Sequence, residues 1–448
     1  MNSTHALARA AVLAATLAAA TLHASDQVPG APQARPVLLR GGDLYTVSHG
    51  VLRTTDLLFD GGKITAIGAR LAAPPSADVV DVTGKRVYPG LIAPATMLGL
   101  IEIGAVRATN DTAETGGITP EAAAHVAYNP DSEILPTVRN HGVTTTQVVP
   151  AGTLLRGRPF VTHLDGWTKE DSAVRLTQGL AVTWPTLPRR SPFDEGGTRR
   201  SREDLEKERR EAITRLEHAF DDARAYLANR SADSPVPPDV RWEAMRPVLE
   251  GNEPVYVEVE TYGGIREALA FAERQKLRAV LVGAADSWRL ASELHERNIP
   301  VILGGALGLP RREDDPYDAA FHAPALLHEA GLKFCIGETG ESWQARNLGL
   351  HAAEAVAFGL PADAALRALT LSTAEILGVD AELGSLDVGK SATLFVSDGD
   401  VLDSLTRRVT NMWIEGRRVD LDDRHKELYR KYKQKPAVVE RRERAQSP

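Results

Sequence analysis

A chain of 448 residues with 43% hydrophobic and 25% charged residues can build a large core and a second, smaller one. Its formal net charge of −8 argues against nucleic acid as a partner, because phosphate recognition needs a basic surface. The single cysteine, Cys335, excludes an internal disulfide and is expected to be a buried core thiol within the run LKFCIG.

Residues 1–24 have the form of a secretory signal peptide. Arg9 precedes an alanine-rich apolar run, and small residues follow at which cleavage after Ala20 or Ala24 fits. The run is too short for a membrane span, and no later segment reaches the roughly 18 apolar residues that a span needs. We therefore expect a secreted or periplasmic protein without a membrane partner; an alanine-rich helical or disordered leader is the alternative.

Residues 37–90 consist of short β-type runs separated by turn signals. Asp60-Gly61-Gly62, between DLLF and KITAIG, is typical of a β-hairpin. The same rhythm returns in residues 376–420, in GSLDVGKSATLFVSDGD and RVTNMWIEGRRV. These two parts are expected to form one small β-sandwich built from both chain ends.

Residues 91–375 alternate apolar strands with helical segments, for example PVYVEVE followed by IREALAFAERQK. This alternation predicts an α/β fold, a TIM-like (β/α)8 barrel. A charged helical insertion at 185–252 is expected to pack on the barrel exterior, with a lid or docking helix as the alternative. The charged tail, 421–448, is expected to end disordered.

Several phrases resemble the metal-dependent amidohydrolase superfamily, most of all its imidazolonepropionase-like branch. DVTGKRVYPGLI is similar to that family's entry into the first barrel strand, and NPDSEILPTVRNHGVTTTQVVPAG with THLDGW to its next segments. GSLDVGKSATLFV is similar to its return to the sandwich. The resemblance implies a metal at the carboxyl ends of the barrel strands and hydrolysis of C–N bonds other than ordinary peptide bonds.

The resemblance also implies a set of metal ligands, from which this sequence departs. Ala95 and Met97 align with the two histidines of strand one, Glu258 with a histidine of strand five, and Gly283 with one of strand six. Thr339 takes the place of the aspartate on the last strand. Alanine has no donor atom and a thioether is a poor zinc ligand, so the usual metal site is expected to be lost.

Carboxylates near the predicted strand ends are the remaining reactive groups. Clustered carboxylates favour an oxygen-ligated divalent cation, or act as a metal-free acid–base pair. The alternative is that they pair with Arg266, Arg289, Arg311 or Arg346. His163 is expected to point into the barrel mouth beside Asp165. The candidate catalytic residues are therefore Glu258, Glu260, Asp286, Glu338, Glu341 and His163.

Three hypotheses follow for the function. The first is an exported amidohydrolase that acts through a rebuilt site. The second is a catalytically inactive protein that binds a small molecule in the barrel mouth. The third is a partner subunit of a complete relative, as a homo- or hetero-oligomer. No Walker loop or dinucleotide fingerprint occurs, so no nucleotide cofactor is expected.

Overall fold

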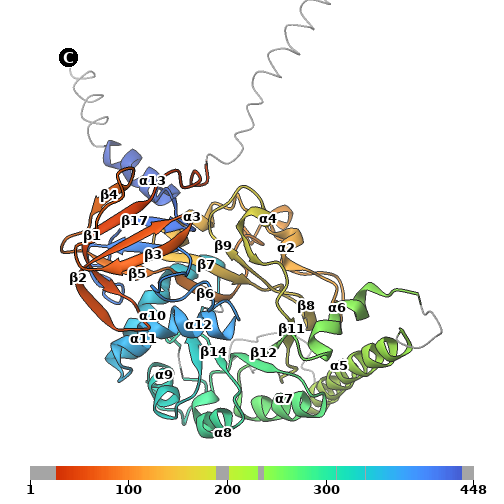
Figure 1. The fold of residues 1–448 in the computed structure, drawn as a ribbon. Helices are drawn as coiled ribbons and strands as arrows, with labels where there is room; N and C mark the ends of the chain where they lie inside the picture. Colours follow the sequence, from red (N-terminus) through yellow and green to blue (C-terminus); the bar gives the residue numbers. More distant parts are fainter. Residues whose placement is uncertain (1–26, 188–200, 231–236, 309, 339, 436–448) are drawn as a thin grey trace, which may run out of the picture.

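The computed structural model describes residues 27–187, 201–230 and 237–435, except Leu309 and Thr339. The predicted signal peptide lies outside these residues, as does the end of the charged tail. A β-rich domain forms one side of the molecule, and a body of strands and helices lies beside it (Figure 1). No helix in the described ranges has both the length and the apolar character needed to cross a bilayer.

The β-rich domain is a single mixed sheet made from both chain ends. β5 joins the two halves because it pairs with β1 in parallel and with β16 antiparallel. The predicted hairpin at Asp60 is confirmed by the pairing of Asp60 with Lys63. The strands are β1 (Val37–Tyr45), β2 (Val51–Asp60), β3 (Lys63–Gly68), β4 (Asp78–Asp81), β5 (Arg86–Pro89), β16 (Leu394–Ser397), β17 (Val409–Ile414) and β18 (Arg417–Arg418).

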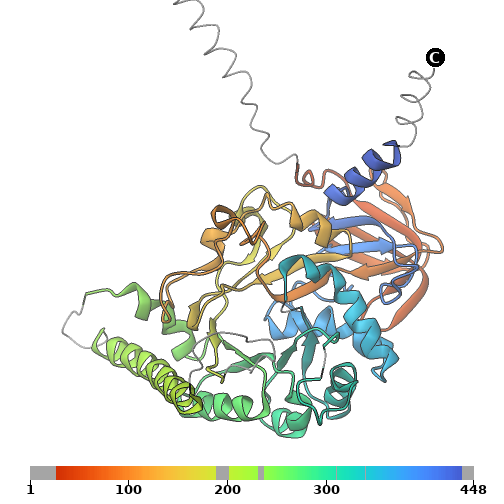
Figure 2. The same ribbon diagram turned by 180° about the vertical axis from the view of Figure 1, so that it is seen from behind.

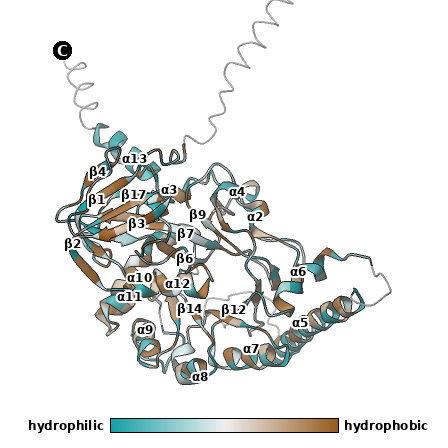
Figure 3. Cartoon of the chain, viewed as in Figure 1, coloured by the Kyte–Doolittle hydropathy of each residue, from teal (hydrophilic) through white to brown (hydrophobic). Residues whose placement is uncertain are grey.

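Hydrogen bonds connect all eight strands, so one curled sheet, rather than the expected pair of sheets, encloses this domain's core. Phe59 and Trp413, one from each end of the chain, meet edge to face inside it, with ring centroids 5.6 Å apart. Strand β1 is largely hydrophobic and helix α13 (Arg424–Lys433), which carries the described part of the tail, is hydrophilic (Figure 3).

The second body has the mixed α/β architecture of a TIM-type barrel, with its strands in two sheets. In the first, β7 lies between a parallel β6 and an antiparallel β9. In the second, β11 to β15 are parallel and β8 is antiparallel at the edge. The strands are β6 (Leu91–Thr96), β7 (Val143–Val148), β8 (Leu154–Gly157), β9 (Phe160–His163), β10 (Ala173–Arg175), β11 (Leu180–Thr183), β12 (Val255–Val259), β13 (Ala279–Gly283), β14 (Val301–Leu303) and β15 (Phe334–Ile336).

The two sheets do not form one continuous hydrogen-bonded barrel among the described strands. The antiparallel β8 and β9 interrupt the predicted parallel order. On the other side the sheets still meet, because Gly337, after β15, packs so closely on Pro94 that an added Cβ would lie 3.1 Å from its Cγ.

Helices cover the outer faces of the parallel strands, with α7 and α8 along one edge of the molecule (Figure 2). α7 begins at Tyr262 because the Thr261 side chain accepts a hydrogen bond from the Gly264 N–H at 3.2 Å. It buries Ile265 and Leu269 on one face. The α-helices of this body, the insertion apart, are α2 (Ala124–Ala127), α3 (Ile134–Arg139), α4 (Lys169–Ser172), α7 (Tyr262–Arg274), α8 (Ala291–Glu296), α9 (Ala319–Glu329), α10 (Leu348–Ala357), α11 (Ala362–Ala368) and α12 (Leu371–Ile376).

The described part of the insertion forms helices α5 (Arg202–Arg230) and α6 (Val240–Leu249). α5 buries Phe220, whose ring meets Phe271 of α7 edge to face at 5.3 Å. The insertion therefore packs on the exterior of the body, as its amphipathic spacing predicts. Cys335 is fully buried, and burial raises the pKa of its thiol to about 12, which fits a core thiol.

Candidate functional site

One cavity of about 260 Å³ opens at the carboxyl ends of the parallel strands, and we call it the mouth cavity. Strands β6, β8, β11, β12 and β13 contribute to its wall. The predicted ligand positions Ala95, Met97 and Glu258 all line it, so these positions do converge. Its lining residues are Ala95, Met97, Val149, Pro150, Ala151, Gly152, Arg156, Thr183, Tyr256, Glu258, Val282 and Gly340.

The charged centre of the mouth cavity is an ion pair between Arg156 and Glu258. Arg156 Nη1 lies 2.6 Å from Glu258 Oε2; the Arg156 side chain is 10% exposed and that of Glu258 40%. Burial lowers the pKa of the Arg156 guanidinium, and the carboxylate of Glu258 partly restores it. Arg156 Nε is buried without a hydrogen-bond partner. The sequence indicated Glu258 but not Arg156.

At Gly283, where the resemblance implies a histidine, a side chain would have to displace the Glu260 carboxylate. An added Cβ would lie 2.3 Å from Oε1 of Glu260, and the residue has a φ of +77°. The Glu260 carboxylate is fixed there by the Arg311 guanidinium at 3.2 Å and by the Ala285 N–H at 3.2 Å. Burial raises the pKa of Glu260, and Arg311 opposes that rise.

Glu260 and Asp286 line a second, separate cavity of about 170 Å³ beside β13, β14 and α9. Asp286 is buried and accepts hydrogen bonds from Arg312 Nη2 at 2.5 Å and from the Tyr262 N–H at 2.7 Å. Pairing with arginine was the alternative explanation for the carboxylates, and it holds for Glu260 with Arg311. The other predicted arginine partners bind elsewhere: Arg289 pairs with Asp315, Arg266 contacts Tyr262, and Arg346 stacks over Trp343.

Glu338 forms a buried pair with His351 at the end of β15. His351 Nε2 donates to Glu338 Oε2 at 2.7 Å, and the Gly340 N–H donates to Oε1 at 2.8 Å. Burial raises the pKa of Glu338, but these hydrogen bonds outweigh it and hold the pKa below its usual value. Glu341 is exposed, and Thr339 lies outside the described residues.

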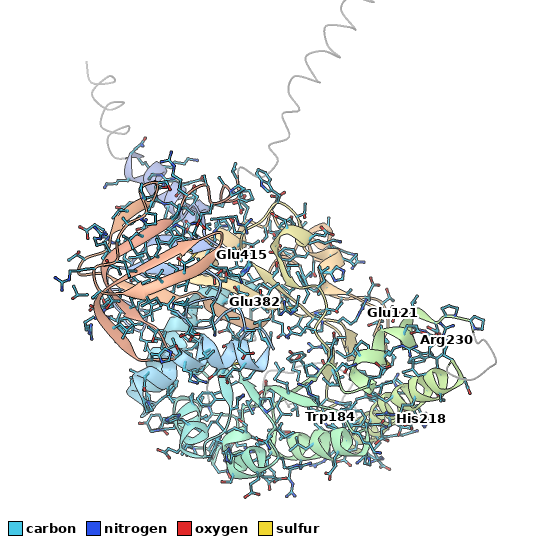
Figure 4. All side chains as sticks on the ribbon, in the orientation of Figure 1. Glu121, Trp184, His218, Arg230, Glu382 and Glu415 are labelled. Carbon is cyan, nitrogen blue, oxygen red and sulfur yellow. The ribbon has the colours of Figure 1, made fainter. Side chains whose placement is uncertain are left out.

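His163 does not point into the mouth, so that expectation is wrong. β9 runs antiparallel to β7, with Thr145 opposite His163 and Val148 opposite Phe160, which places His163 at the other end of the strands. Its Nδ1 lies 3.0 Å from Thr145 Oγ1, and its Nε2 lies 3.9 Å from Glu415. Glu415 stands where the β-rich domain meets the barrel strands (Figure 4).

Because His163 is buried, we expect the free energy of unfolding to depend on pH. Burial, aided by the nearby Arg417, lowers its pKa to about 3, whereas an unfolded histidine titrates near 6.5. The unfolded state therefore binds more protons between these values, and the free energy of unfolding should fall by about 1.4 kcal/mol for each pH unit below about 6.5. Urea titrations from pH 7.5 to 5 measure this slope. His163→Asn should make it shallower; an unchanged slope would contradict this assignment.

The described residues of the mouth do not fit a divalent metal. No group of three or more His, Cys, Asp or Glu side chains suited to a metal occurs in the described ranges. In the mouth cavity the Arg156 guanidinium already neutralises Glu258, and its positive charge repels a cation. In the second cavity, Arg311 and Arg312 do the same for Glu260 and Asp286.

Comparisons with known proteins agree with the fold. Amidohydrolase tasK of Hapsidospora irregularis is 23% identical over 389 residues, and the match spans 81% of this chain but only 39% of that relative. A dihydroorotase of Geobacter sulfurreducens is 43% identical over 56 residues, 12% of this chain and 13% of the relative. This chain thus covers well under half of each relative's length.

Among solved structures, an amidohydrolase from Thermotoga maritima MSB8 superimposes with a TM-score of 0.76 at 23% identity, over 86% of this chain and 99% of that one. A prolidase complexed with N-methylphosphonate-L-proline gives a TM-score of 0.53 at 19% identity, over 86% and 99% of the two chains. Residues 273–419 match the model of the amidohydrolase family. The chain is therefore similar to the amidohydrolase family over residues 273–419, and its fold is that of an amidohydrolase structure.

Proposed function

We propose that this protein is a member of the amidohydrolase family that binds a small molecule in its mouth cavity and does not carry out the metal-dependent hydrolysis typical of the superfamily. The observation that supports this most is the Arg156–Glu258 ion pair, which stands among the positions where metal ligands are expected. The Arg156 guanidinium occupies the Glu258 carboxylate, so this oxygen donor is not available to a metal. Its positive charge also disfavours the binding of a catalytic metal ion at this point.

The loss of the usual metal site and the imidazolonepropionase-like branch are parts of this proposal. Ala95 and Met97 supply no suitable ligand, and the Glu260 carboxylate fills the space beside Gly283.

Hydrolysis of a C–N bond through a metal-free carboxylate is the second candidate function. The family match supports it, and so does Glu260, because burial raises its pKa toward the range of a general acid. Glu260 lines the second cavity rather than the mouth cavity, so this activity would use a different site.

Metal analysis combined with a hydrolysis screen distinguishes the proposed ligand-binding function from metal-free hydrolysis. We expect substoichiometric metal in the purified full chain, and no turnover of cyclic amides or dipeptides after addition of Zn²⁺ or Mn²⁺. Glu258→Gln should leave the metal content unchanged, as should the surface control Glu293→Gln, which also removes an ion pair, with Arg297. Stoichiometric metal with turnover, both lost in Glu258→Gln, would overturn the proposed function. Metal-independent turnover lost in Glu260→Gln would favour the second candidate.

A further inference from the structure

The two charged side chains of the mouth cavity, Arg156 and Glu258, are buried to different extents. The Glu258 side chain is 40% exposed, whereas that of Arg156 is 10% exposed and carries an Nε that has no hydrogen-bond partner. A buried charged donor without a partner costs free energy that a ligand oxygen can recover. Arg156 is therefore a suitable group for a ligand anion, and the more accessible Glu258 for a ligand cation.

The net charge of the pair selects between classes of ligand. A ligand with a single negative charge would compete with Glu258 for Arg156 and leave the carboxylate without its partner. A ligand with a single positive charge would do the reverse to Arg156. A ligand that carries both charges can satisfy each side chain and adds no net charge to a partly buried site.

The remaining wall of the mouth cavity is mainly apolar. Met97, Val149, Pro150 and Val282 line it, and its volume is about 260 Å³. This space suits a molecule smaller than typical drug-sized ligands, with an apolar part opposite its charged groups.

We propose that the mouth cavity binds a zwitterionic molecule of the amino-acid type with an apolar side chain. Its carboxylate pairs with Arg156, its ammonium group pairs with Glu258, and its side chain packs on Met97, Val149 and Val282. This inference rests on the proposed function and adds the chemical class of the ligand.

Isothermal titration calorimetry on the full chain, at low salt and neutral pH, tests this class. The probes are L-leucine, N-acetyl-L-leucine, which has only the negative charge, and L-leucinamide, which has only the positive one. We expect L-leucine to bind roughly tenfold or more tightly than either blocked form, because each blocked form forgoes one charged hydrogen bond. Glu293→Gln should bind all three as the unsubstituted protein does.

Glu258→Gln gives the sharper result, because it changes charge without changing size. We expect it to weaken L-leucine and L-leucinamide and to strengthen N-acetyl-L-leucine, for which Arg156 is then free of its competitor. Arg156→Lys keeps the cation and should retain the order of preference. If N-acetyl-L-leucine binds the unsubstituted protein most tightly, the site is an anion site and the zwitterion proposal is wrong.

A parallel thermal-shift screen with neutral cyclic amides distinguishes the failure of this inference from that of the proposed function. A neutral amide that stabilises the protein and loses its effect in Glu258→Gln, while L-leucine does not bind, would overturn the ligand class and leave the proposed function standing. Absence of binding by every probe, in a protein that melts cooperatively, would overturn both.

Discussion

Gly283→Ala is expected to lower the free energy of unfolding by about 2–6 kcal/mol. The residue has a φ of +77°, a conformation that costs an L side chain about 1–3 kcal/mol. The new Cβ would also lie 2.3 Å from Glu260 Oε1, and relieving that overlap costs about 1–3 kcal/mol more. Chemical denaturation with urea, at fixed pH, measures the change.

Gly251→Ala is the matched control for this experiment. Gly251 has a φ of +80° but nothing within 4 Å of an added Cβ, so it reports backbone strain alone. Glu260→Ala combined with Gly283→Ala should cost less than the sum of the two single changes, because the overlap is gone. Equal losses for Gly283→Ala and Gly251→Ala would show that Glu260 does not limit the space beside β13.

Asp165→Asn is expected to destabilise the protein by about 3 kcal/mol, because it leaves the buried Arg139 without its counter-ion. Arg139 Nη1 lies 3.1 Å from Asp165 Oδ1, and the two side chains are 8% and 1% exposed. Asp165 also accepts a hydrogen bond from the Gly30 N–H at 3.1 Å and lies 4.0 Å from Arg417. Urea denaturation again provides the measurement.

Asp239→Asn serves as the surface comparison, since its partner Arg241 is 49% exposed and the pair contacts solvent. That change should cost about 0.5 kcal/mol or less. A loss for Asp165→Asn as small as that for Asp239→Asn would mean that the neutral amide satisfies Arg139 and that the ion pair carries no special stability.

The β-rich domain and the parallel strands could be predicted because their signals are local. Turn residues such as Asp60-Gly61-Gly62 fix a hairpin, and apolar runs followed by amphipathic helices favour parallel pairing. The antiparallel direction of β8 and β9 has no comparable signal, since a short apolar strand has the same sequence pattern whether it pairs in parallel or antiparallel. For this reason the sequence predicts His163 in the mouth, whereas the residue lies at the opposite end of the strands.

The same limit applies to the candidate site. Ala95, Met97 and Glu258 follow or end predicted strands, and the carboxyl ends of parallel strands meet, so their convergence could be predicted. Arg156 comes from β8, an edge strand, and no sequence pattern connects it to Glu258. The division of the carboxylates between two cavities likewise depends on Arg311 and Arg312, which lie on a loop whose path the sequence does not determine.

The sheet shared by the two chain ends also affects the order in which the protein folds. Tyr88 of β5 pairs with Phe395 of β16, and their rings stack with centroids 5.3 Å apart. The sheet of the N-terminal strands is therefore complete only when strands far along the chain have joined it. Contacts of such long sequence separation form slowly and leave strand edges exposed meanwhile. A chain that ends before β16 should therefore be protease-sensitive in its N-terminal strands even where β11 to β13 have assembled.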